Sequence, residues 1–244
     1  ICEPQSGVSD GVFAYLRDDH FILEPTNPDK VCTTLGVAAH NLYENPSPYH
    51  IYEPNGMLDT SGAKYEQLDR QRVKVSGSGF VHAEKYTIKL EGAEQYGYRT
   101  IILGGIRDPI LIGVLDERLA GIREEVQQRG QEMGVATTDY QMAFQVFGKD
   151  AVMGRLEPER DKPIHEVGLL IDVVGQTQDI ANAIIGLARR AVLHGHFKGR
   201  LCTAGNYATP YGAIRMGPAY RFSIWHLVEP DNAYEMFPVE IVNV

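Results

Sequence analysis

The stretch between residues 98 and 119 constrains the fold of this chain more than any other. An apolar, β-branched run at residues 100–103 predicts a strand, and Gly104 and Gly105 then interrupt the pattern. Asp108 followed by Pro109 predicts a helix start, because aspartate caps free N–H groups and proline lacks an N–H that the first turn would leave unpaired. The sequence therefore predicts a strand, a glycine turn and a helix N-terminus, in that order.

This predicted turn has the features of an anion site. Helix N-termini present unpaired N–H groups, glycines let a ligand approach the main chain, and the planar guanidinium of Arg107 suits a carboxylate or phosphate. We therefore predict that Gly104, Gly105 and Arg107 bind an anionic substrate. The alternative is a tight strand-to-helix connection with a solvated arginine, since such turns are common in folds that bind nothing there.

Composition narrows the class of partner. The chain has 244 residues, 43% of them hydrophobic, and a formal charge of −9, which argues against nucleic acid and anionic membrane surfaces as partners. No apolar run approaches membrane-spanning length. Cys2, Cys32 and Cys202 form no C-x-x-C pair, so we expect reduced thiols in a cytoplasmic protein.

Helical and strand patterns alternate along the chain. The patterns predict helices at residues 27–43, 109–129 and 178–193, and strands at residues 11–16, 21–24, 72–75, 86–90, 141–147, 167–174 and 220–228. Residues 49–62 are expected to form a loop and residues 148–163 a polar surface excursion. The nearly continuous apolar run at residues 167–174 is typical of a strand that is covered on both faces.

These patterns predict the fold class. We expect an α/β fold, with α+β as the alternative, in which a mixed β-sheet is layered with helices. Residues 1–244 are expected to form one unit, with a subdivision near residues 135–165 as the alternative.

Other residues are candidates for chemistry. Glu91 ends a predicted strand and would be a general base if buried, or else a solvated strand-end acid. Asp108 is first a helix cap and second a catalytic candidate. Around Gly205, the residues Thr203 and Asn206 form a turn whose N–H groups suit a carboxylate, or an ordinary loop.

Metal and cofactor signals are weak. His194 and His196 invite a metal interpretation, but they follow a helix end where histidines are common, and no further ligand lies at a fixed spacing. Cys202 is a minor candidate nucleophile. The chain has no phosphate-binding loop, nucleophile elbow or dinucleotide fingerprint, so we expect neither a metal nor a cofactor.

An ordered set of motifs nevertheless resembles a known family. The set comprises residues 37–44 (VAAHNLYE), 58–59 (LD), 65–68 (YEQL), 73–77 (VKVSG), 86–93 (YTIKLEGA), 97–100 (GYRT), 105–109 (GIRDP), 177–182 (TQDIAN), 203–206 (TAGN) and 222–227 (FSIWHL). Taken together over nearly the whole chain, they resemble the acyclic terpene utilisation (AtuA-like) family.

The resemblance implies how much of a typical family member this chain represents and in which kind of metabolism it acts. Members of this family are typically longer, so the chain would correspond to their C-terminal half, as a fragment or a subunit, and would lack an N-terminal half that forms the other wall of a cleft. The family appears in the catabolism of branched acids and acyl-CoA thioesters. A homo-oligomer or hetero-oligomer is therefore expected.

Three functions remain open. The first is a catabolic enzyme, or a subunit of one, that acts as a hydro-lyase or carbon–carbon lyase on a small carboxylate or acyl-CoA thioester, which needs an anion clamp and one acid or base but no redox cofactor. The second is a non-catalytic subunit or carboxylate-binding module that completes a site on a partner chain. The third is a carboxylate sensor, for which the sequence offers no positive sign.

Overall fold

The computed structural model describes residues 2–4, 11–40, 47–200, 202, 204–232, 234 and 236–242. The chain divides into two compact units, one formed by Ile1–Glu91 with Ile224–Val244 and the other by Gly92–Ser223. We call them unit 1 and unit 2. Residues 135–165 lie within unit 2, and the strands β10 (Ile88–Ile106) and β13 (Ile214–Val228) contribute to both units.

Within the described residues, unit 1 is built from short antiparallel strands and one helix, α1 (Thr34–His40). Its strands are β1 (Cys2–Pro4), β2 (Val12–Leu16), β3 (His20–Pro25), β4 (Lys30–Cys32), β5 (His50–Glu53), β6 (Gly56–Asp59), β7 (Lys64–Gln67), β8 (Val73–Ser76) and β9 (Gly79–His82). They form the sheets β1-β4, β2-β3-β8-β7 and β5-β6-β9. A small core contains Leu23, Cys32, Val37, Val73 and Val75.

Three expectations for unit 1 are wrong. The helix predicted at residues 27–43 begins only at Thr34, because Asn27 forms a turn in which its Oδ1 accepts the N–H of Asp29, and the strand β4 follows. The loop predicted at residues 49–62 contains the hairpin β5–β6. Cys32 is disulfide-bonded, so the expectation of three reduced thiols is also wrong.

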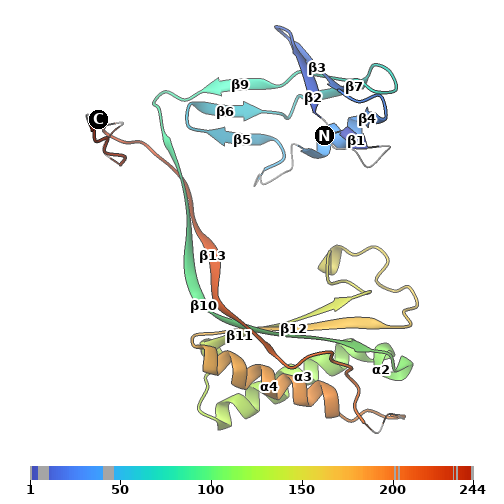
Figure 1. Ribbon diagram of the computed structural model, residues 1–244. Coiled ribbons are helices and arrows are strands. Elements are labelled where there is room, and N and C mark those ends of the chain that lie inside the picture. The colour runs from blue at the N-terminus through green and yellow to red at the C-terminus, as the bar shows by residue number, and fades with distance from the viewer. Residues whose placement is uncertain are drawn as a thin grey trace. The chain divides into compact units, whose positions relative to one another are not determined.

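Unit 2 is a two-layer α+β structure (Figure 1). Its antiparallel sheet has the order β11-β12-β10-β13, where β11 is Tyr140–Phe147 and β12 is Val167–Gly175. The long helices α3 (Leu115–Glu132) and α4 (Gln178–His194) pack against each other and cover one face of the sheet. The short helix α2 (Pro109–Gly113) precedes α3, and the 3-10 turns η1 (Thr137–Asp139) and η2 (Gly154–Leu156) complete the unit. The expected class of helices layered on a sheet is confirmed.

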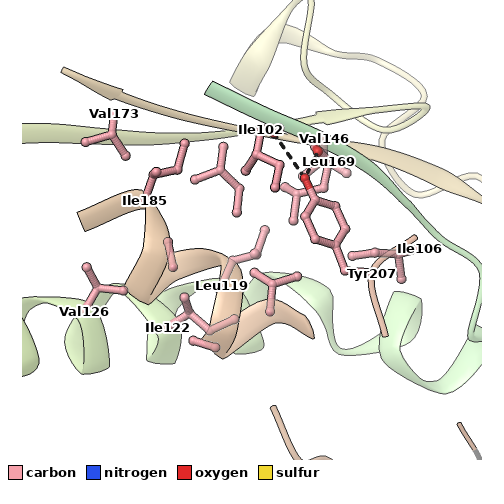
Figure 2. Close-up of a cluster of buried hydrophobic side chains, with 14 of the residues drawn as sticks. Ile102, Ile106, Leu119, Ile122, Val126, Val146, Leu169, Val173, Ile185 and Tyr207 are labelled. Carbon is pink, nitrogen blue, oxygen red and sulfur yellow. Dashed lines mark hydrogen bonds between the residues drawn. The ribbon is translucent and has the colours of Figure 1, made fainter. Parts of the chain in front are cut away.

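The core of unit 2 lies between this sheet and its helices (Figure 2). Alternate residues of β12, from Val167 to Val173, are fully buried against α3 and α4, whereas Leu170 and Asp172 point to the opposite face and are only half-buried. Tyr207, from the segment between α4 and β13, reaches into the core, and its hydroxyl donates to the carbonyl of Leu169 at 2.7 Å. The expectation that β12 is covered on both faces therefore holds for one face of the described structure.

Candidate functional site

The carboxyl end of β10 leads into α2 as the sequence predicts. Asp108 caps α2, and its Oδ1 accepts the N–H groups of Ile110 at 2.8 Å and Leu111 at 3.1 Å. The single helix predicted for residues 109–129 is instead two helices, because α2 ends at Gly113 and α3 begins at Leu115 after a break at Val114.

The predicted glycine turn is wrong, because Gly104 and Gly105 lie inside β10, which continues to Ile106. Gly105 exchanges two main-chain hydrogen bonds with Ala208, of 2.8 and 2.9 Å. A Cβ on Gly104 would lie 2.5 Å from the ring of Tyr207. The two glycines therefore allow residues 207–208 to pack closely against the strand.

Gly205 and Asn206 lie in the same segment and also make packing contacts. The Asn206 side chain is buried, and its Nδ2 donates to the carbonyls of Val192 at 3.3 Å and Gly195 at 2.8 Å, so it binds the last turn of α4. A Cβ on Gly205 would lie 2.5 Å from Leu193. Thr203 lies outside the described residues. The structure thus brings the predicted glycines and Asn206 together around Tyr207, and their contacts there are with the protein itself.

Arg107 and Glu91 have different surroundings. Arg107 is exposed, and no described residue accepts a hydrogen bond from its guanidinium. Glu91 is 51% exposed and lies within β10 rather than at its end, in an ion pair of 3.3 Å with Lys89. Glu91 belongs to unit 1, whereas the other predicted site residues belong to unit 2.

A groove of about 330 Å³ adjoins the helix that Asp108 caps. One wall is formed by α2 and the start of α3, with Pro109, Ile112, Gly113 and Leu115, and the other by the excursion after β11, with Lys149, Arg160, Asp161, Lys162, Pro163, Ile164 and the first residue of β12, Val167. We call it the α2 groove. Three cations and one carboxylate line it together with apolar side chains, so its lining carries a net positive charge in an acidic protein.

Carboxylates outside the lining pair with all three of these cations. Lys162 Nζ lies 2.5 Å from Glu159 Oε1. Asp116, in the first turn of α3, accepts from Lys149 Nζ at 2.7 Å through its Oδ2, and Arg160 Nη2 lies 3.3 Å from the same oxygen. Arg160 also lies 3.1 Å from Asp150. The hydrogen bond from Lys149 lowers the pKa of the Asp116 carboxyl below its ordinary value, so Asp116 is ionised at neutral pH.

This groove could hardly be predicted from the sequence. Residues 148–163 were predicted only as a polar excursion, because the lining cations are scattered over 14 residues and meet α2 only in the folded chain. A larger hollow of about 500 Å³ lies along the same excursion, but four carboxylates (Asp150, Glu157, Glu159 and Glu166) line it beside two lysines. The α2 groove is therefore the better place for an anion.

The described contacts of His194, His196 and Cys202 indicate neither a metal site nor a catalytic nucleophile. His194 and His196 are exposed, and within the described part of the chain no group of three or more His, Cys, Asp or Glu side chains is placed to hold a metal ion. The thiol of Cys202 donates to the carbonyl of Gly205 at 2.6 Å. None of the helices in the described ranges is long and apolar enough to cross a membrane.

Comparison with known proteins gives one match. The family described as "Acyclic terpene utilisation family protein AtuA" matches residues 18–220 of the chain. No curated protein and no solved structure matches the chain. The matched region extends over most of unit 1 and almost all of unit 2, including the α2 groove.

Proposed function

The chain belongs to the acyclic terpene utilisation family, and from this premise we propose that it is part of a catabolic enzyme that acts on a small branched carboxylate or its acyl-CoA thioester. We further propose that the α2 groove binds the anionic end of that substrate. The observation that carries this proposal is the combination, in one groove, of an apolar wall and three cations.

A branched acyclic acid has two chemically distinct ends. Its hydrocarbon end would pack against Ile112 and Ile164, two partly exposed apolar residues of the groove lining. Its carboxylate would accept charge-assisted hydrogen bonds from Lys149, Arg160 and Lys162, which are stronger than bonds between neutral groups. The lining of the groove is thus complementary to both ends of such a ligand.

The site residues predicted from the sequence enter this proposal at one end of the groove. Arg107 precedes Pro109, a lining residue, by two positions, and its unpaired guanidinium would add a further donor for the substrate. Asp108 uses Oδ1 to cap α2, and its Oδ2 accepts no hydrogen bond from any described residue. We propose Asp108 as the acid or base of a lyase reaction, which would need no redox cofactor. Glu91 stays a prediction that no contact supports.

Calorimetric titration of the whole chain with methylsuccinate, a branched dicarboxylate, tests this function. Arg160→Gln should weaken binding by about tenfold or more, because a hydrogen bond to a charged group contributes roughly 1.5–3 kcal/mol. Arg107→Lys should weaken it less, because a planar fork is replaced by a point charge. Arg190→Gln, at an exposed position on α4, is the matched control and should bind like the wild type. Equal affinities of the Arg160→Gln variant and the wild type would contradict the proposal.

The second candidate is a binding subunit that completes a site on a partner chain. It is favoured by the open face of the unit 2 sheet, defined by Leu103, Phe147 and Leu170, because α3 and α4 cover only the opposite face. Leu103 is 50% and Phe147 43% exposed, and adjacent apolar side chains on one surface mark an association site. An association surface of this kind would place the chain in an assembly.

The expected cytoplasmic location remains a proposal. It agrees with the chemistry of acyl-CoA thioesters, but the disulfide at Cys32 counts against it, because cytosolic proteins seldom keep structural disulfides.

A further inference from the structure

Asp116 lies at the centre of a charge network beside the α2 groove. Its Oδ2 is 2.7 Å from Lys149 Nζ and 3.3 Å from Arg160 Nη2, and both cations line the groove, whereas Asp116 does not. The Lys149 side chain is only 15% exposed, so its ammonium is partly desolvated and needs a counterion. Asp116 therefore neutralises the cations of the groove from outside its lining.

The second carboxylate of the network acts on Arg160 alone. Asp150 Oδ2 lies 3.1 Å from Arg160 Nη2, and its side chain is 18% exposed. Lys149 pairs with Asp116, Arg160 with Asp116 and Asp150, and Lys162 with Glu159 at 2.5 Å. A ligand that enters the groove therefore meets cations that already have carboxylate partners.

We infer that Asp116 is a built-in counterion against which the substrate's anionic group competes for Lys149 and Arg160, so that its charge sets how tightly the α2 groove binds an anion. This inference rests on the proposed function. A monoanion that takes Asp116's place at the two cations exchanges one carboxylate for another, with little net gain. A dicarboxylate or a phosphate brings more acceptors than a monoanion, but its second charge is repelled by the same carboxylate, so removal of the Asp116 charge should tighten the binding of either kind of ligand.

The Asp116→Asn variant isolates this role. Asparagine keeps the shape and an oxygen acceptor for Lys149 but removes the negative charge. Removal of a unit charge about 4 Å from the bound anion changes its affinity by at least about fivefold even when water screens the interaction. Titration with isovalerate, a branched monoanion, should therefore show at least about fivefold tighter binding to Asp116→Asn than to the wild type.

Three controls make the outcome specific. Asp179→Asn removes a carboxylate from the first turn of the other long helix, α4, and should leave isovalerate binding unchanged. Asp150→Asn removes the second carboxylate on Arg160 and should tighten binding in the same direction, which provides an independent test if Asp116→Asn does not fold. Titration of the wild type with methylsuccinate and with inorganic phosphate shows whether the chain binds a carboxylate or phosphate anion at all.

The possible results separate this inference from the proposed function. If the wild type binds methylsuccinate or phosphate, and the carboxylate variants bind isovalerate no more tightly than the wild type does, Asp116 only positions the cations and the inference is wrong while the proposed function stands. If the wild type binds none of these anions, both the inference and the proposed function are wrong.

Discussion

At the scale of single residues, Tyr207 and Gly104 depend on each other. The Tyr207 ring is buried, its hydroxyl donates to the Leu169 carbonyl, and it lies where a side chain on Gly104 would be. Burial raises the pKa of this hydroxyl, which remains protonated and able to donate at any ordinary pH. The contact holds residues 206–208 in place, where Asn206 binds the end of α4 and Ala208 pairs with Gly105 near the end of β10.

Alanine substitutions at two glycines test this dependence. Gly104→Ala should lower the free energy of unfolding by about 1–3 kcal/mol, because the new Cβ would meet the Tyr207 ring and the Ala208 carbonyl. Gly186→Ala, in the middle of α4 with nothing within 4 Å of the new Cβ, should raise it by about 0.5–1 kcal/mol. Urea denaturation of both variants measures the difference, and equal stabilities would contradict this account of Gly104.

Individual residues differ in how well their roles could be predicted from the sequence. The cap at Asp108 was predictable, because it depends on residues two and three positions away. The role of Gly104 was not, because the Tyr207 ring that needs the space lies 103 positions later. The cations of the α2 groove were missed for the same reason, since nothing near Lys149 in the sequence indicates that it faces α2.

At the scale of elements, local periodicity was a good guide only where the element packs by its own pattern. The helix α4 and the strand β12 follow the predicted ranges closely, because each has a long apolar pattern that faces the core. The helix predicted at residues 27–43 was wrong, because the pairing of β4 with β1 overrides a helix-start signal at Asn27. Short elements are decided by partners that a local pattern does not contain.

The short helix α2 depends on its cap, since five residues form little more than one turn. Asp108→Ala should lower the free energy of unfolding by about 0.5–2 kcal/mol and speed amide hydrogen exchange at Ile110 and Leu111, whose N–H groups lose their acceptor. Asp108→Ser retains a capping oxygen and is the control. Unchanged exchange at both amides in the alanine variant would show that the cap does not hold α2.

At the scale of the whole molecule, the two faces of the unit 2 sheet differ. The helices α3 and α4 cover one face, and the opposite face exposes Leu103 and Phe147. We therefore expect the isolated chain to associate. Leu103→Glu should shift it to monomers in analytical ultracentrifugation, because a charge would be buried without a partner in the interface. Leu35→Glu, at a leucine on α1 that is 77% exposed, is the control and should leave the association state unchanged. A wild-type chain that sediments as a monomer at high concentration would show that this face needs no cover.

A crystal structure of the chain with methylsuccinate would show whether the α2 groove binds the anionic end of a branched carboxylate. We expect ligand density between α2 and residues 149–164, with a carboxylate within hydrogen-bonding distance of Lys149 and Arg160 and the methyl group against Ile112 or Ile164. Density for the ligand elsewhere on the chain, with this groove holding only water, would contradict it.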